Sequence, residues 1–389
     1  MISQALLPPQ YTDLSGQELE GRIAARKRQL GSGLCILGHH YQRDEIVRFA
    51  DFVGDSLKLS QQAAARTDAR YIVFCGVHFM AESAEVLSGP DQVVCLPNLR
   101  AGCAMADMAE DDAVAVALEE IAALTDAKVV PVTYVNSSAG AKALTARAGG
   151  ACCTSSNVRN VFAWALRSQG DGGAGARKVL AVPDQHLGRN TAVAMGYSLD
   201  DCVVYDPALP SGGLTREGVG RATFILWKGQ CYVHQVFRPQ DVLKARAADK
   251  DVIVIVHPEC PYEVVRLCDA AGSTEQIIQA VAEAQPGSRW AVGTECNLVH
   301  RLARRFPDRS VSLLSNAPAR CAQMAQIDLP HLLWVLDHLA RGEVVNRVTV
   351  APDVAADARI ALQRMIQIKA GAELIRPPKA QRSIPSPPA

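Results

Sequence analysis

The chain is organised around the stretch Trp227-Lys228-Gly229-Gln230-Cys231-Tyr232-Val233-His234. It continues the apolar run Phe224-Ile225-Leu226, so we expect Cys231 to lie where a buried strand gives way to a loop. Cys103 and Cys321 have comparable surroundings, although both lie far from Cys231 in the sequence. Thiolates select zinc, copper or iron–sulfur clusters among cellular metals. Our hypothesis is that these three thiolates converge on one iron–sulfur cluster, around which the fold is built.

The spacing of the cysteines excludes a local zinc ribbon. The chain has twelve cysteines and no Cys-x-x-Cys pair, so any thiolate site must be assembled from remote segments. Most of the twelve are expected to pack in the core, because free cysteine behaves as a small apolar side chain. That group comprises Cys35, Cys75, Cys95, Cys152, Cys202 and Cys268. Cys260 and Cys296 each follow a glutamate near the end of an expected strand, which makes them second-choice ligands.

The size and composition of the chain limit the classes of protein to which it can belong. The 389 residues suffice for two or three domains, and an apolar content of 49% can fill several sheets. Basic and acidic residues both number 40, so without a concentrated positive surface neither nucleic acid nor a membrane is an expected partner. Residues 1–10 do not resemble a secretory signal, and no apolar run reaches membrane-spanning length. We expect a cytoplasmic protein without disulfides.

Short apolar runs alternate with helical patterns along the chain, which is typical of parallel sheets covered by helices on both faces. Strands are predicted at residues 34–37, 71–74, 93–96, 129–135, 179–182, 224–227, 252–256, 290–292 and 311–314. Helices are predicted at residues 16–31, 56–68, 80–88, 111–124, 138–147, 158–168, 239–249, 262–271, 275–284, 296–306 and 330–341. The fold class is therefore α/β.

The alternation divides the chain into three units, each of which closes near one of the three chosen cysteines. The expected domains are residues 1–110 with an N-terminal helix, 111–235 and 236–345. Glycine, proline and aspartate gather at about 195–221, which we interpret as an inserted loop of the second unit. A helical segment at 346–375 and a disordered proline-rich tail at 376–389 would follow.

Polar residues that can carry chemistry follow the expected strands. His257-Pro258-Glu259 places an imidazole and a carboxylate two residues apart, as a general base and its partner require. Two similar pairs are His39 with Tyr41 and Tyr134 with Asn136. Ligands of open α/β sheets bind just outside the carboxyl ends of the strands. We therefore expect these pairs and His234 to line one polar cavity, although any single pair could equally belong to a structural hydrogen-bond network.

Three hydroxyl residues occupy positions where a helix could start, namely Ser56, Ser155 and Thr274. Free N–H groups and the positive end of the dipole suit such positions to carboxylate or phosphate. An ordinary helix cap is the alternative at each position. With one such residue in each unit, three anion-binding positions around one cavity are predicted.

At these residues the sequence resembles the quinolinate synthase family over about residues 33 to 345. The motifs that carry the resemblance are Ile36-Leu37-Gly38-His39-His40-Tyr41-Gln42-Arg43-Asp44-Glu45-Ile46, Gly54-Asp55-Ser56-Leu57, Gly76-Val77-His78-Phe79-Met80-Ala81-Glu82, Tyr134-Val135-Asn136-Ser137-Ser138, Pro183-Asp184-Gln185-His186-Leu187-Gly188-Arg189, Trp227-Lys228-Gly229-Gln230-Cys231 and His257-Pro258-Glu259. The resemblance implies three αβα domains with parallel sheets, related by pseudo-threefold symmetry around a central [4Fe–4S] cluster. Cys103, Cys231 and Cys321 would be its ligands, one from each domain.

The resemblance also implies an activity and a set of site residues. The family condenses iminoaspartate with dihydroxyacetone phosphate to quinolinate, releasing phosphate and two waters, on the de novo route to NAD. An aspartate-oxidising enzyme would supply the first substrate, and the open iron would act as a Lewis acid. The catalytic residues would be Glu259, Tyr134, His257, Tyr41 and His234. The substrate-binding residues would be His39, Ser56, Tyr134, Asn136, Ser155, His257, Glu259 and Thr274.

Two departures from the family pattern and two rival functions stay open at this point. Cys321 is followed by Ala322 where many members have proline or further cysteines, which makes Cys321 the least secure ligand and a redox switch there unexpected. Cys103 is followed by Ala104-Met105 where Ser-Leu is common, a milder change. The first rival is an iron–sulfur hydro-lyase that dehydrates a hydroxy acid without releasing phosphate. The second is a non-enzymatic binding protein whose cysteines are all buried.

Overall fold

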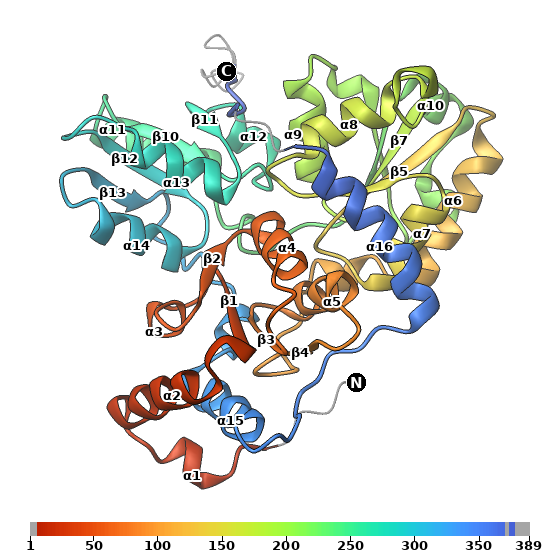
Figure 1. Ribbon diagram of the computed structural model, residues 1–389. Coiled ribbons are helices and arrows are strands. Elements are labelled where there is room, and N and C mark those ends of the chain that lie inside the picture. The colour runs from red at the N-terminus through yellow and green to blue at the C-terminus, as the bar shows by residue number, and fades with distance from the viewer. Residues whose placement is uncertain (1–5, 370–372, 378–389) are drawn as a thin grey trace.

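Three separate parallel sheets form the framework of the chain (Figure 1). The computed structural model describes residues 6–369 and 373–377. The sheets have four, five and four strands, ordered β2-β1-β3-β4, β6-β5-β7-β9-β8 and β11-β10-β12-β13, and we call them the first, second and third lobe with their helices. They confirm the predicted α/β class with three αβα lobes. The limits proposed for the domains remain a prediction.

The first lobe carries the N-terminal helices as well as its sheet. Its strands are β1 (Leu34–His39), β2 (Phe52–Gly54), β3 (Tyr71–Cys75) and β4 (Val93–Cys95). Its helices are α1 (Pro9–Thr12), α2 (Gly16–Leu30), α3 (Asp44–Val47), α4 (Ser56–Ala65) and α5 (His78–Leu87). Helix α15 (Leu329–Leu339) returns from the far end of the chain to pack on α2, where Arg22 and Arg26 pair with the buried Asp337 at 2.7 and 2.6 Å. Helix α15, which follows the third lobe in the sequence, is therefore packed on the first lobe.

The second lobe has the widest sheet. Its strands are β5 (Val129–Tyr134), β6 (Ala151–Cys153), β7 (Lys178–Val182), β8 (Cys202–Tyr205) and β9 (Phe224–Trp227). Its helices are α6 (Asp111–Leu124), α7 (Ala139–Arg147), α8 (Val158–Leu166), α9 (Gln185–Ala194) and α10 (Arg216–Arg221). Helix α16 (Pro352–Gln367), drawn in blue in Figure 1, lies along α7 and β6. The C-terminal part of the chain therefore covers the second lobe.

The third lobe is the simplest. Its strands are β10 (Ile253–Val256), β11 (Ala270–Ala271), β12 (Arg289–Gly293) and β13 (Ser310–Leu313). Its helices are α11 (Pro239–Ala248), α12 (Tyr262–Val265), α13 (Thr274–Ala282) and α14 (Cys296–Arg305). Ile375 pairs with Ala271 as an isolated antiparallel bridge at the edge of this sheet.

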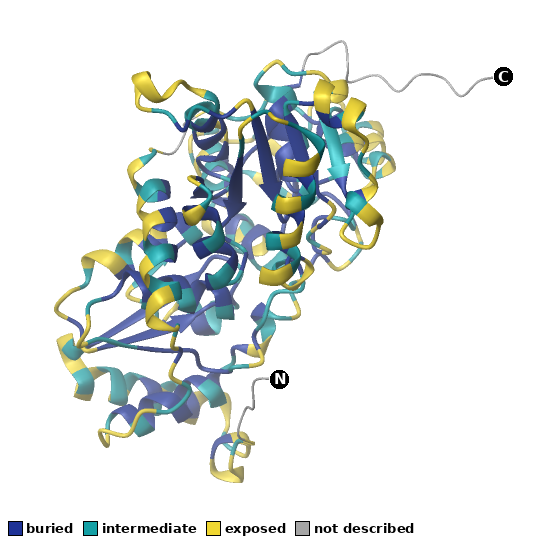
Figure 2. Cartoon of the chain, turned by 90° about the vertical axis from the view of Figure 1, so that its right-hand side faces the viewer, coloured by how far each residue is buried: buried dark blue, intermediate teal, exposed yellow. Residues whose placement is uncertain are grey.

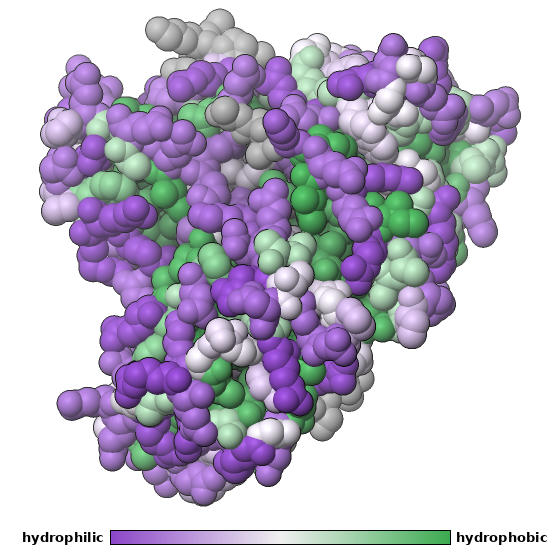
Figure 3. All heavy atoms as spheres, viewed as in Figure 1, coloured by the Kyte–Doolittle hydropathy of each residue, from purple (hydrophilic) through white to green (hydrophobic). Residues whose placement is uncertain are grey.

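Burial follows the layers. The central strands β1, β3 and β7 are buried at every position, as expected for parallel strands covered on both faces. Figure 2 shows buried strands inside each lobe and exposed residues on the outer sides of the helices. Hydrophilic residues cover most of the face seen in Figure 3. None of the helices that the structure describes is long and apolar enough to cross a membrane.

Several local predictions were wrong. The segment at 195–221 is not a simple loop, because it contains β8, which pairs in parallel with β9, and α10, which Thr215 caps. The helix predicted at 262–271 ends at Val265, and the last two residues of that range, Ala270 and Ala271, form β11. Within 346–375 only α16 is helical among the described residues. The tail expected to be disordered lies outside the described residues except for 376–377.

Candidate functional site

The three chosen cysteines face one cavity of about 730 Å³ between the lobes. Its lining comes from the strand-end loops of all three sheets. The predicted site residues in its wall are His39, Tyr41, Ser56, Cys103, Tyr134, Asn136, Ser155, Cys231, His234, His257, Glu259, Thr274 and Cys321. The cavity therefore brings together every residue that the sequence singled out for chemistry, while their individual roles stay predictions. Among the described lining residues, neither second-choice ligand, Cys260 nor Cys296, occurs.

Each cysteine loop is tied to its lobe by the same backbone hydrogen bond. In each lobe, the first residue of a helix donates its N–H to the carbonyl two residues before the cysteine. The three bonds are His78 N to Ala101 O (2.7 Å), Gln185 N to Gly229 O (3.0 Å) and Cys296 N to Ala319 O (2.8 Å). Helices α5, α9 and α14 thereby hold the three loops in equivalent ways.

The three cysteine sulfurs share one buried space and lie near backbone N–H groups. Burial raises the pKa of Cys103 to about 12 although the N–H groups of Ala106 and Met105 lower it, and it raises the pKa of Cys231 and Cys321 as well. Each of the thiols Cys103 and Cys321 raises the pKa of Cys231 further. Backbone N–H groups also approach the sulfurs, as Met324 N does to Cys321 Sγ at 3.4 Å. Three thiolates in one buried space require a compensating cation, and N–H···S bonds are a means of tuning iron–sulfur centres.

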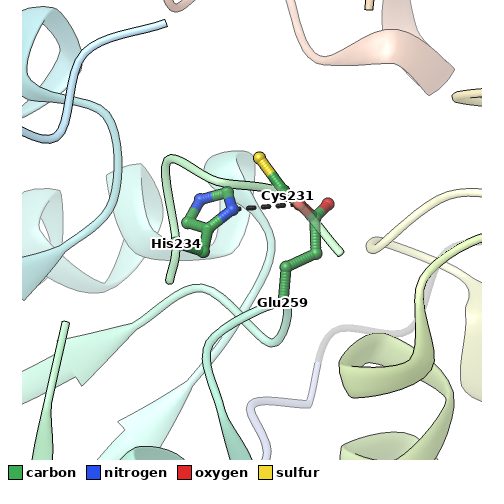
Figure 4. A group of neighbouring side chains, drawn as sticks. All are labelled: Cys231, His234 and Glu259. Atoms are coloured by element: carbon green, nitrogen blue, oxygen red, sulfur yellow. Dashed lines mark hydrogen bonds and ion pairs between the residues drawn. The ribbon is translucent and has the colours of Figure 1, made fainter. Parts of the chain in front are cut away.

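A more compact group lies beside one cysteine. The ligand atoms of Cys231, His234 and Glu259 lie within 4.8 Å of one another, the only such group among the described residues (Figure 4). His234 Nδ1 and Glu259 Oε2 are 2.9 Å apart, as the dashed line in Figure 4 marks. A single ion needs ligands this close, whereas ligands on different irons of a cluster lie farther apart. The geometry therefore places His234 and Glu259 directly beside Cys231, one of the three predicted cluster ligands.

The third lobe supplies a buried carboxylate between imidazoles. Burial lowers the pKa of His257 to about 3, so this imidazole is neutral at pH 7. Burial alone would raise the pKa of Glu259, but His257, His234 and the Tyr134 hydroxyl outweigh it and hold that pKa at about 2. Burial raises the pKa of Tyr134 well above its ordinary value. At neutral pH the wall therefore holds an ionised carboxylate next to a protonated phenol, an acceptor and a donor of protons.

The His257 ring is fixed by its neighbours. It stacks on His234 with ring centroids 4.4 Å apart, and its Nε2 lies 3.3 Å from Ser155 Oγ. Ser155 belongs to the second lobe, so this contact joins two lobes at the cavity. Contrary to expectation, Ser155 does not start a helix, because α8 begins at Val158 and Ser155 lies in the turn before it. Ser56 and Thr274 do begin helices, α4 and α13.

Sequence reasoning missed Thr294, which links two of the predicted residues. Thr294 is fully buried, and its hydroxyl lies 2.9 Å from Tyr41 Oη and 3.3 Å from His234 Nε2. Thr274 Oγ1 donates to the same Tyr41 oxygen at 3.4 Å. The one feature of the sequence that could have indicated a role for Thr294 is its position just beyond the end of β12. Its contacts hold the Tyr41 phenol of the first lobe against the third lobe.

Two further residues of α14 that the sequence did not reveal grip the loop after β1. Arg301 donates to the carbonyls of His40 (2.8 Å) and Gln42 (2.6 Å). Asn297 donates to the carbonyl between them, Tyr41 O, at 3.1 Å. Three consecutive carbonyls of the first lobe are thus held by two side chains of the third. This clamp determines where His39 and Tyr41 lie in the cavity wall.

Comparison with known proteins points to one family. The family model described as quinolinate synthetase A protein matches residues 21–367. The quinolinate synthase of Nocardioides sp. is 52% identical over 364 residues, 93% of this chain and 91% of the relative. The quinolinate synthase of Streptomyces coelicolor is 51% identical over 361 residues, 91% of this chain and 89% of the relative. That of Acidobacterium capsulatum is 50% identical over 363 residues, 92% of this chain and 95% of the relative.

Proposed function

The chain belongs to the quinolinate synthase family, iron–sulfur enzymes of NAD biosynthesis, and from this premise we propose its reaction and the parts of its residues. It condenses iminoaspartate with dihydroxyacetone phosphate to quinolinate, releasing phosphate and two waters. The observation that carries the proposal is one cavity whose lining includes the three cysteines and the ten predicted polar residues from three lobes. An aspartate-oxidising enzyme is the proposed source of iminoaspartate. Because the relatives are enzymes, a purely binding function is set aside.

Cys103, Cys231 and Cys321 would hold a [4Fe–4S] cluster. Their position in one cavity and the backbone N–H groups that approach the sulfurs support this ligand set. With three protein ligands, such a cluster offers one open iron that polarises a carbonyl or hydroxyl oxygen as a Lewis acid. Everything else in the reaction falls to side chains and backbone groups of this chain.

Binding would rest on donors to three anionic groups, since iminoaspartate carries two carboxylates and the triose a phosphate. The N-termini of α4 and α13, with the hydroxyls of Ser56 and Thr274, suit these groups. Ser155 adds a hydroxyl from the second lobe. Asn136 Oδ1 is buried and has no hydrogen-bond partner among the described residues, so it is available to accept a bond from a substrate hydroxyl or imine N–H.

Proton transfer would rest on Glu259 and Tyr134. At pH 7 the low pKa leaves Glu259 ionised and the high pKa leaves Tyr134 protonated, so the carboxylate would face the substrate as the acceptor and the phenol as the donor. Both shifts are opposite to those that strengthen a general base or acid, so positioning against the reacting atoms would have to provide the rate. Tyr41, with its hydroxyl held by Thr294, would be a second donor. His257 and His234, stacked on one another, would orient Glu259 and the substrate. The wall would thus provide the acid and the base that a condensation followed by dehydration needs.

Anaerobic turnover tests the proposal. Protein purified without oxygen should contain about four irons per chain. With dihydroxyacetone phosphate, and with iminoaspartate formed in place from oxaloacetate and ammonium, it should produce quinolinate and inorganic phosphate in equal amounts. A cluster-loaded protein that makes no quinolinate would overturn the proposal. Dehydration of a hydroxy acid without phosphate release would favour the hydro-lyase instead.

A further inference from the structure

The three cysteine loops share one backbone bond but differ in the residue that precedes the supporting helix. That residue is Val77 before α5, Asp184 before α9 and Glu295 before α14. Two of the three positions therefore carry a carboxylate at the helix start, next to the loop of a cysteine. The first position carries an apolar side chain.

Asp184 serves two N–H groups at once. Its Oδ1 accepts the N–H of Leu187 at 2.7 Å and caps α9, while its Oδ2 accepts the N–H of Cys231 at 3.2 Å. The backbone of Asp184 also bridges to Gly229 in parallel register, and the side chain is 3% exposed. Burial, and then the charge of Glu259, raise the pKa of Asp184 well above its ordinary value, so its effect rests on geometry: two amide N–H groups bonded to separate oxygens of one buried side chain fix its orientation. The carboxylate therefore fixes the start of α9 and the backbone of Cys231 together.

We propose that Asp184 is a positioning residue for the cluster, which holds the backbone of Cys231 so that its thiolate points into the cavity. The proposal rests on the ligand set assigned under the proposed function. Capping alone would need only one carboxylate oxygen, and the second is directed at the cysteine. Partners that orient metal ligands influence metal affinity and the electronic properties of the centre although they do not touch the metal.

Glu295 repeats part of this arrangement in the third lobe. It is fully buried, and its Oε2 accepts the N–H of Asn297 at 2.7 Å and of Leu298 at 3.4 Å. The backbone N–H of Cys321 also faces this carboxylate and helps to lower its pKa, which burial raises to about 7. The same kind of side chain thus lies behind two of the three ligands.

The test separates the two oxygens of Asp184. Serine at a helix start still caps the helix, but its single short hydroxyl cannot serve Leu187 and Cys231 together. Asp184→Ser, and the isosteric Asp184→Asn in case the serine variant folds poorly, are compared with Asp328→Ser. Asp328 caps α15 through the N–H of His331 at 2.9 Å and also pairs with the ring of His331 at 2.6 Å. Its carboxylate has no bond to a cysteine loop among the described residues, so Asp328→Ser is the control for loss of a capping carboxylate.

The primary measurement is the rate at which the anaerobic holoprotein loses iron to bathophenanthroline disulfonate. We expect a rate about tenfold higher for the Asp184 variants and an unchanged rate for Asp328→Ser. The electron paramagnetic resonance spectrum of the reduced cluster should shift in the Asp184 variants alone. Thermal midpoints of Asp184→Ser and Asp328→Ser should fall by similar small amounts, about 2 °C.

Two results would overturn the inference in different ways. Unchanged iron release and spectrum in the Asp184 variants, together with loss of the cluster in Cys231→Ser, would leave Asp184 as a cap only. A full cluster in Cys231→Ser would show instead that the ligand set of the proposed function is wrong, and the positioning role would fall with it.

Discussion

The Cys103 corner of the cavity and the Cys231 corner are built on the same backbone bond but are filled with opposite side chains. The wall of the cavity near Cys103 includes the apolar residues Val77, Phe79, Met80, Ala104 and Met105. Cys103 also lines a second pocket, which contains His78, Glu82, Arg100 and Asp107. Around Cys231 lie Asp184, His234 and Glu259, all buried and polar. Equivalent loops therefore present mainly apolar side chains to the cavity at one corner and buried polar side chains at the other.

This difference shows that what the three lobes repeat is a main-chain hydrogen bond and not a set of side chains. The N–H of a first helical residue and a carbonyl two residues before a cysteine can be supplied by any residues, so three lobes can share a geometry with no sequence repeat. Side chains are then free to differ from corner to corner.

The first prediction tests the feature that the corners share. Replacing Cys103, Cys231 or Cys321 singly by serine should abolish the brown colour and the quinolinate synthesis equally, because each lobe contributes one ligand. Iron and sulfide content, with the visible absorption spectrum, measures the effect. Cys296→Ser is the control, since Cys296 is absent from the cavity lining among the described residues.

One result would break the comparison outright. If Cys321→Ser kept its cluster while Cys296→Ser or Cys260→Ser lost it, the third corner would use a different ligand. The sequence made Cys321 the least secure of the three, so this variant is the most informative one.

The second prediction tests the feature that the corners do not share. Glu259→Gln removes the ionised carboxylate but keeps its shape, and kcat should fall about 10²- to 10⁴-fold, as for loss of a general base. Iron content should not change, because Glu259 is not among the three ligands. Met80→Leu, a volume-conserving change in the apolar corner, should leave kcat near that of the unaltered protein. Equal losses in both variants would contradict a division of labour between the corners.

Much of the fold could be predicted from the sequence, because buried parallel strands consist of continuous apolar residues. All nine predicted strands exist, but β2, β6, β8 and β11 were missed. These are edge strands of two to four residues, and β11 is Ala270–Ala271 alone, too short for any periodicity. Tertiary pairing determines such strands, as β8 shows within the segment expected to be a loop.

The residues that line the cavity could be predicted from the sequence, but the residues that hold them in place could not. The predicted residues lie in short polar motifs that follow apolar strands, and all of them line the cavity. Thr294 and Arg301 act on partners remote in sequence, since Arg301 grips a carbonyl 261 positions away. The sequence around Thr294 and Arg301 does not indicate which residues they will contact. Asp184 stood inside a motif, yet its bond to Cys231 required the fold.

The third prediction concerns the clamp that joins the first lobe to the third. Arg301→Gln removes the bonds to His40 O and Gln42 O, so the loop that carries His39 and Tyr41 should shift relative to the Cys231 corner. A displacement of about 1 Å can cost about 10²-fold in rate, and kcat/KM should fall by up to that amount. Steady-state kinetics at matched iron content checks this.

Arg304→Gln is the matched control for the clamp. Arg301 and Arg304 both pair with Asp44, but only Arg301 is bonded to the loop carbonyls. The control should therefore keep its kcat/KM within about twofold, because an exposed ion pair contributes little. If both variants lost activity alike, the pairing with Asp44 rather than the clamp would be responsible.

The smallest effect expected concerns His39, a buried imidazole of the first lobe. Burial, and then the charges of His40 and Arg301, lower the pKa of His39 to about 3, whereas the unfolded chain has an ordinary histidine. Below pH about 6.5 the unfolded state binds one proton more than the folded state, so the contribution of His39 to stability is complete above that pH and declines as the pH falls toward 3.

Between pH 7.5 and 5.5 the decline due to His39 should be about 1.4 kcal/mol in the free energy of unfolding. His39→Gln should remove that part of the pH dependence, while His300→Gln, a change on the exposed side of α14, should keep it. Urea unfolding of the anaerobic protein at several pH values measures the difference between the variants and the unaltered chain. If the pH dependence of His39→Gln were unchanged, His39 would take up a proton in the folded cavity as readily as in the unfolded chain, and the first lobe would face its partner lobes with a charge rather than with a neutral ring.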